Sequence, residues 1–210
     1  MSRYLHTLLN AIDLQVPSGL ANPEIKNLSC DSRAIEKGDL FLGLEGEKVD
    51  GGTYWEQALK RGACAALISK NASLLNPPNN ADPVVILPNP VSLFMGKLAA
   101  DFWNKPSSEI CLIGVTGTNG KTTTSFLIEF LTASLGHPSA LFGTLINRWP
   151  NHEETSKYTT TFAVPLQAKL SKVVETGVEY AAMEVSSYAL TQNRVAGCDF
   201  SGAIFTNLSR

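Results

Sequence analysis

The chain has 210 residues, with 17 Lys and Arg against 19 Asp and Glu, and a formal net charge of −2. Hydrophobic residues make up 44% and charged residues 17%, so the chain can bury a core and is not a disordered tail. The slight acidic balance argues against a nucleic-acid partner, and the longest apolar run, about six residues near 110–115, is too short to span a membrane.

The first half of the chain alternates short apolar strands with helices. Strands are expected at 39–44, 63–68 and 84–87, helices at 54–61 and 91–103, and a loop at 76–80. Pro106 and the two serines after it form a plausible hinge. We therefore expect a small α/β domain over residues 1–107.

The second half shows the same alternation more clearly. Strands are expected at 110–115, 139–142, 179–185 and 203–206, with helices at 121–135 and 163–175. Gly136 and Pro138 mark the end of the first helix. Helices between apolar strands predict a mostly parallel sheet with right-handed crossovers, over residues 108–210.

A glycine-rich segment, GVTGTNGKTT from Gly114 to Thr123, follows an apolar strand and opens a helix. This setting is typical of a phosphate-binding loop, because small residues let backbone N–H groups and the helix N-terminus approach phosphate oxygens. Val115 stands where the common pattern has glycine. The segment predicts a nucleotide site at Gly117, Thr118, Asn119, Gly120, Lys121, Thr122 and Thr123.

Two kinds of side chain at this edge of the sheet favour phosphoryl chemistry. Lys121 is expected to reach the terminal phosphates, and Thr122 or Thr123 to offer a hydroxyl to Mg²⁺. Glu184 ends a neighbouring strand, where a hard carboxylate suits Mg²⁺. From the residues alone, Glu184 could equally be a solvated or capping glutamate. We assign catalytic roles to Lys121 and Glu184.

The loop TGTNGKTT resembles the ATP loop of the Mur ligase family, which elongates the peptide stem of bacterial cell-wall precursors. Three further segments are similar to its UDP-N-acetylmuramoyl-tripeptide synthetase branch. These are EVSS from Glu184, QNRVAG from Gln192 and FTNLSR from Phe205. The segments CDSR from Cys30 and GDLF from Gly38 also fit, so the resemblance spans nearly the whole chain.

The resemblance implies a UDP-sugar-binding domain followed by an ATP-binding domain. In the first domain it implies that Cys30 and Ser32 hold the uridine-sugar end, helped by a loop of Glu47, Lys48 and Val49. In the second domain it implies contacts to the nucleotide-sugar peptide from Tyr158, Thr159, Thr160, Ser186, Gln192 and Arg194. Without the resemblance, most of these residues would pass as caps, turns or surface groups.

Two residues depart from the branch pattern. Tyr188 stands where the branch commonly has His, and Thr161 where it has Pro or Gly. The role of that His in positioning substrate is therefore open in this chain.

The implied activity is that of an ATP-dependent amide ligase in peptidoglycan synthesis. ATP phosphorylates a free carboxylate of UDP-N-acetylmuramoyl-L-alanyl-D-glutamate, and the amine of the third stem residue attacks the acyl phosphate. The implied cofactors are ATP and Mg²⁺, and the partners are small molecules bound by a monomer. Four scattered cysteines and the lack of a long apolar N-terminal block favour the cytoplasm. The motifs do not separate diaminopimelate from lysine as the added residue.

Family enzymes have three domains, of which the motifs here cover the first and the opening half of the second. We therefore expect this chain by itself to be unstable or inactive, as an incomplete part of the ligase. Three alternatives stay open: a non-catalytic UDP-sugar- or ATP-binding fragment, an unrelated P-loop nucleotidase or kinase, and the Mur branch that adds the terminal dipeptide.

Overall fold

The computed structural model describes residues 3–46 and 49–209. The chain divides into two compact units, Met1–Phe102 and Trp103–Arg210. Each unit is a mixed α/β structure built on a mostly parallel sheet, which confirms the predicted fold class. Within the described ranges, no helix combines the length and apolar character needed to span a bilayer.

The first unit is built on a four-stranded parallel sheet in the order β1-β2-β3-β4. The strands are β1 Leu28–Ser29, β2 Leu40–Leu42, β3 Ala65–Ser69 and β4 Val84–Leu87. The helices are α1 Leu5–Ala11, α2 Trp55–Arg61, α3 Lys70–Leu75 and α4 Val91–Phe102, with a short 3₁₀ helix at Gly51–Tyr54. Alternate strand residues such as Phe41 and Ile68 pack with Trp55 of α2 in one buried cluster.

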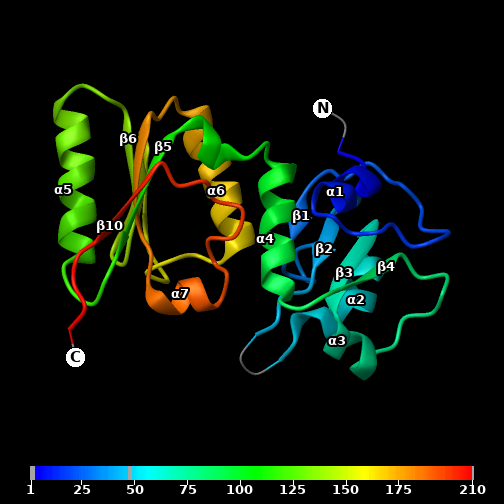
Figure 1. The fold of residues 1–210 in the computed structure, drawn as a ribbon. Coiled ribbons are helices and arrows are strands. Elements are labelled where there is room, and N and C mark those ends of the chain that lie inside the picture. Colours follow the sequence, from blue (N-terminus) through cyan, green and yellow to red (C-terminus); the bar gives the residue numbers. More distant parts are fainter. Residues whose placement is uncertain (1–2, 47–48, 210) are drawn as a thin grey trace. The chain divides into compact units, whose positions relative to one another are not determined.

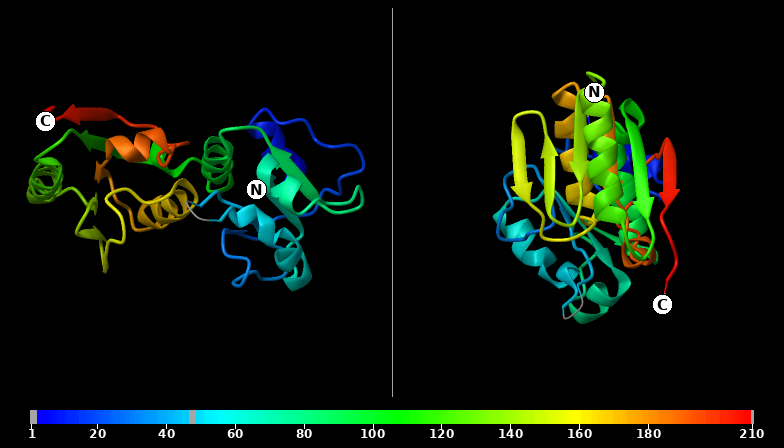
Figure 2. Two further views of the ribbon diagram at one scale, coloured as in Figure 1. Left: turned by 90° about the horizontal axis from the view of Figure 1, so that it is seen from below. Right: turned by 90° about the vertical axis from the view of Figure 1, so that its left-hand side faces the viewer.

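The second unit has a six-stranded sheet in the order β10-β5-β9-β6-β7-β8. The strands are β5 Cys111–Thr116, β6 Ser139–Phe142, β7 Ile146–Trp149, β8 His152–Thr155, β9 Tyr180–Glu184 and β10 Gly202–Phe205. The first four in sheet order are parallel, and β7 and β8 form an antiparallel hairpin. Figure 2, right, shows red β10 at one edge and the yellow hairpin at the other.

Helices cover both faces of this second sheet. Helix α5 (Lys121–Ser134) lies on one face and α6 (Ala163–Glu175) on the other (Figure 1). Leu166 and Leu170 of α6 pack against Leu112 and Met183 of the central strands, and all four are buried. This apolar stripe is the helical spacing seen in the sequence. The remaining helices are α7 Ser187–Thr191 and a 3₁₀ helix at Pro106–Glu109.

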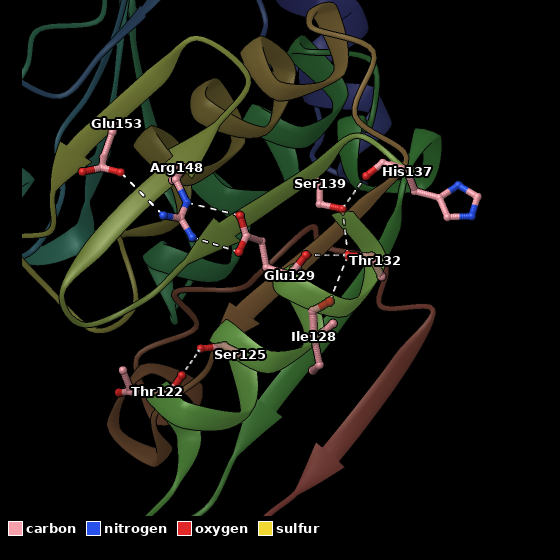
Figure 3. Close-up of polar contacts among 9 residues, drawn as sticks. All are labelled: Thr122, Ser125, Ile128, Glu129, Thr132, His137, Ser139, Arg148 and Glu153. Atoms are coloured by element: carbon pink, nitrogen blue, oxygen red, sulfur yellow. Dashed lines mark hydrogen bonds and ion pairs between the residues drawn. The ribbon is translucent and has the colours of Figure 1, made fainter. Parts of the chain in front are cut away.

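Polar contacts hold α5 on the sheet at two levels (Figure 3). Arg148 of β7 donates to both carboxylate oxygens of Glu129, at 3.2 and 2.8 Å, and also pairs with Glu153 at 3.7 Å. One turn further on, the hydroxyls of Thr132 and Ser139 lie 2.7 Å apart. Because α5 begins at Lys121, directly after the glycine-rich loop, these contacts also fix the position of Lys121 relative to the sheet.

Candidate functional site

The glycine-rich loop connects the end of β5 to the start of α5 at Lys121. Gly117 and Gly120 have φ of +132° and +83°, backbone angles that residues with a side chain rarely adopt. They turn the backbone between strand and helix. The ammonium group of Lys121 folds back over the loop and donates to the carbonyls of Gly117 at 2.7 Å and Thr118 at 3.1 Å. A cation therefore lies directly above the loop, at the N-terminus of a 14-residue helix.

The segment after β10 braces this loop. The carbonyl and side-chain oxygens of Asn207 accept from the N–H groups of Thr118 at 2.9 Å and Asn119 at 3.2 Å. The hydroxyl of Thr206 donates to the carbonyl of Asn119 at 2.7 Å. Two loop amides are thus bound to Asn207. The first-turn N–H groups of α5 have no acceptor within the helix, so they are the donors that can face a phosphate group.

This bracing leaves no room for a side chain at Gly117. An added Cβ would lie 2.2 Å from the Thr206 hydroxyl and 2.8 Å from the Asn207 carbonyl. Gly177 has φ +74° and nothing within 4 Å, so Gly177→Ala should lose only about 1–2 kcal/mol of unfolding free energy. Gly117→Ala should lose a further ~1–3 kcal/mol by overpacking. Urea unfolding of both variants measures the difference, and equal losses would contradict the bracing.

Glu184 ends β9 next to the loop. The pairing of Val115 with Glu184 across β5 and β9 puts the carboxylate beside the phosphate loop. The residue is 0% exposed, and its oxygens accept from the Thr122 hydroxyl at 2.9 Å and from the Thr144 amide at 2.9 Å and hydroxyl at 3.0 Å. Thr123, the other threonine that follows Lys121, is exposed.

The donors around Glu184 fit Mg²⁺ held together with a nucleotide. Within 3–46 and 49–209, no Lys, Arg or His forms an ion pair with this buried carboxylate, and no three His, Cys, Asp or Glu side chains cluster as a metal site. Mg²⁺ is commonly bound through one or two carboxylates plus substrate phosphates, and Glu184 with the Thr122 hydroxyl supplies such a set. The arrangement therefore suits a metal-bound nucleotide and not a free metal ion.

Thr159 and Thr160 lie close to the same strand end. The Thr160 hydroxyl donates to the Glu184 carbonyl at 2.9 Å and accepts from the Ser186 amide at 3.2 Å. The hydroxyls of Thr159 and Thr144 lie 3.1 Å apart. Ser186 itself caps α7, since its hydroxyl accepts from the Ala189 amide.

Arg194 is buried among aromatic rings and holds the same segment. Its guanidinium donates to the Thr160 carbonyl at 2.9 Å and, through Nε, to the Gln192 side chain at 2.8 Å. The guanidinium carbon lies 4.1, 5.3 and 5.7 Å from the ring centroids of Phe162, Tyr158 and Tyr188. Through these contacts Arg194 braces residues 158–162. Tyr188, one of the two departures from the branch pattern, supplies one of the rings around the guanidinium group.

In the first unit, Cys30 and Ser32 line a cavity of about 600 Å³. The Ser32 hydroxyl donates to the Gln57 side chain at 2.7 Å. The other lining residues are Asp31, Arg33, Phe41, Gly51, Tyr54 and Gln57. Val49 is 52% exposed, and Glu47 and Lys48 lie outside the described residues.

Arg33 and Asp31 form an exposed ion pair at the cavity, with two hydrogen bonds of 2.9 Å. Side-chain and backbone hydrogen bonds from Arg33 lower the pKa of Asp31 to about 2. The carboxylate therefore stays charged, and it pairs with Arg33 beside the cavity.

The Cys30 thiol should be unreactive in the folded chain, because burial raises its pKa to about 12. A thiol with that pKa is ~0.01% thiolate at pH 8, against ~10% for one with pKa near 9. We expect iodoacetamide to label Cys30 at least ~100-fold more slowly in the native chain than in urea, since the thiolate is the nucleophile. Mass spectrometry of timed samples gives the rates. Equal native and unfolded rates would show an exposed thiol.

The sequence motifs led to Lys121, Thr122 and Glu184, which the structure brings to one edge of the sheet. The motifs gave no indication of Thr144, which contributes two of the donors to Glu184. They also missed Tyr54 and Gln57 at the cavity of the first unit. Proximity of Thr144 to Glu184 could be found only by knowing that β6 pairs with β9.

Two family models match most of the chain. The Mur ligase family catalytic domain matches residues 24–103, and the Mur ligase middle domain matches residues 115–210. Curated relatives named UDP-N-acetylmuramoyl-L-alanyl-D-glutamate–2,6-diaminopimelate ligase include those of Prochlorococcus marinus strains NATL1A and MIT 9313, 87% and 57% identical over 210 residues. Each match covers 100% of this chain and 41% of the relative, so the chain spans about two fifths of their length.

Solved structures show the same likeness. A structure named for the same ligase matches with a TM-score of 0.82 and 29% identity, over 100% of this chain and 41% of that one. The ligase MurF from Acinetobacter baumannii matches with a TM-score of 0.55 and 21% identity, over 89% of this chain and 36% of that one, which is a likeness of fold. With the phosphate loop, the strand-end glutamate and both family models in agreement, the chain belongs to the Mur ligase family.

Proposed function

We propose that this chain carries the acceptor-binding and nucleotide-binding parts of an ATP-dependent ligase that adds diaminopimelate to UDP-N-acetylmuramoyl-L-alanyl-D-glutamate. The first unit binds the UDP-sugar end at the Cys30–Ser32 cavity, and the second binds ATP with Mg²⁺ at the loop 117–123. The process served is peptidoglycan precursor synthesis in the cytoplasm, with a monomer acting on small molecules.

One observation carries the proposal: the glycine-rich loop that leads from β5 to Lys121 lies beside the buried Glu184, which ends the adjacent parallel strand β9. This edge of an α/β sheet is where ligands bind in such folds. A cation and an anion set this way suit a phosphate chain and the metal ion bound to it. The names of the relatives support diaminopimelate as the added residue over lysine, and the tripeptide branch over the dipeptide-adding branch.

The chain's own residues have separate tasks in this reaction. Lys121 and the first-turn amides of α5 orient and neutralise the terminal phosphates. Glu184 and Thr122 would hold the metal ion, which when bound with ATP would shield the negative charge of the phosphoryl group. Thr159, next to the buried Thr160 that Arg194 fixes, presents its hydroxyl to the acceptor beside that point. ADP leaves after the first transfer, and phosphate leaves when the amine displaces it from the acyl phosphate.

Calorimetry on the 210-residue chain tests both halves of the proposal. UDP-N-acetylmuramoyl-L-alanyl-D-glutamate and ATP with Mg²⁺ should each bind at one site, and Ser32→Ala should weaken only the first. Exposed Ser18→Ala is the matched control in the first unit. Failure of ATP to bind would remove the nucleotide role. Because this chain by itself is expected to be inactive, the test measures binding alone, and failure of the acceptor to bind would remove the acceptor role of the first unit.

A further inference from the structure

Thr144, in the turn between β6 and β7, holds the Glu184 carboxylate from two sides. Its amide donates to Oε1 at 2.9 Å and its hydroxyl to Oε2 at 3.0 Å. Thr144 is exposed, whereas Glu184 is fully buried. The threonine therefore covers the carboxylate at its border with solvent.

The residue before Thr144 explains why this turn can approach so closely. A Cβ on Gly143 would lie 2.4 Å from Oε1 of Glu184, so only glycine lets the backbone reach the carboxylate. The pairing of Phe142 with Met183 sets this register, because it puts the residues that follow each strand side by side. The turn is thus shaped around Glu184, with glycine giving access and threonine giving donors.

All the donors to Glu184 are neutral. The Thr122 hydroxyl and the two Thr144 groups fix the carboxylate's orientation without cancelling its charge. A hydroxyl has one proton and a carboxylate only accepts, so when Thr144 donates to Glu184 its oxygen is left to accept from Thr159. Thr144 consequently links the metal-facing carboxylate to the segment proposed to meet the acceptor.

We infer that Thr144 is a positioning residue for the divalent cation: it fixes the Glu184 carboxylate in the orientation that binds Mg²⁺ with the nucleotide. This role rests on the proposed function of the phosphate loop. It goes beyond it by assigning metal affinity to a residue outside the loop 117–123 and helix α5. The isosteric variant Thr144→Val keeps the amide donor and removes only the hydroxyl.

The experiment is a titration of the full 210-residue chain with ATP at increasing Mg²⁺, followed by calorimetry. Thr144→Val should raise the Mg²⁺ concentration needed for half-maximal effect by about three- to tenfold, less than the full worth of one hydrogen bond to a charged group because the amide donor of residue 144 remains. ATP affinity without Mg²⁺ should stay within about twofold. Thr144→Ser restores the hydroxyl and should restore the Mg²⁺ dependence. Thr155→Val, at an exposed position of β8, is the matched control.

The outcomes separate this inference from the proposed function. A wild-type chain that binds ATP without any effect of Mg²⁺ overturns both. Where the wild-type chain shows Mg²⁺ dependence, two results for Thr144→Val overturn the inference alone. One is a Mg²⁺ dependence equal to that of the wild type, and the other is an equal loss of ATP affinity with and without Mg²⁺. Should Thr144→Val fail to fold by circular dichroism, Thr144→Ala removes the same hydroxyl with less bulk, and the same two comparisons decide.

Discussion

Lys121→Ala should weaken the binding of ATP with Mg²⁺ by about 10- to 100-fold, the equivalent of one or two charge-assisted hydrogen bonds. The ammonium group lies over the loop, 2.7 Å from the Gly117 carbonyl. From this position it can bind the phosphates of a nucleotide that occupies the loop. Binding of UDP-N-acetylmuramoyl-L-alanyl-D-glutamate should not change, since its proposed cavity belongs to the first unit. Calorimetry with each ligand separately measures both affinities.

Lys172→Ala is the control for this variant. It removes the same charge from an exposed position on α6 in the same unit, and ATP affinity should remain within about twofold of the wild type. If Lys121→Ala and Lys172→Ala lower ATP affinity equally, the effect is one of overall charge, and Lys121 has no place in the site.

Glu184→Gln should abolish the Mg²⁺ dependence of ATP binding, an effect of at least ~10-fold at saturating Mg²⁺, because the carboxylate beside the loop loses its charge. The chain should still fold. The Gln oxygen can accept from the Thr144 amide, and the two threonine hydroxyls can turn to accept from the Gln NH₂ group. Titration of ATP binding with Mg²⁺ reports the first effect, and urea unfolding reports the second.

Glu175→Gln tests whether a general loss of negative charge has the same result. Glu175 is exposed at the end of α6, and its substitution should leave the Mg²⁺ titration unchanged. Persistence of full Mg²⁺ dependence in Glu184→Gln would remove Glu184 from the metal site and, with it, the proposed phosphoryl chemistry.

Local apolar patterns were enough to predict the main elements of both sheets. The bounds of β4, β6 and α6 agree with the sequence prediction, because each is a short apolar or amphipathic run closed by polar or turn residues. The hairpin β7–β8 was missed. Its second strand, β8, reads HEET and has no apolar pattern. Ion pairs join the hairpin to residues distant in sequence: Arg148 of β7 pairs with Glu129, and Glu154 of β8 pairs with Lys169.

The candidate site likewise contains residues that a local motif predicts and residues that only the strand order reveals. Lys121 and Thr122 follow from a contiguous motif in a strand–turn–helix setting, so one segment of sequence carries the signal. Thr144 is a lone threonine in a turn, and nothing near it in sequence indicates a role. Its position depends on strand order, since β9 enters the sheet between β5 and β6 and brings Glu184 to both.

The brace formed by residues 206–209 has a consequence for the order of events during synthesis. Thr118 and Asn119 bond to Asn207 and Ser209, which the ribosome adds about ninety peptide bonds later. A nascent chain can wind α5 early, yet its glycine-rich turn is left without its partners until Ser209 has emerged. On the proposed function, nucleotide capture is therefore a late event in the maturation of this polypeptide, and it follows the docking of β10.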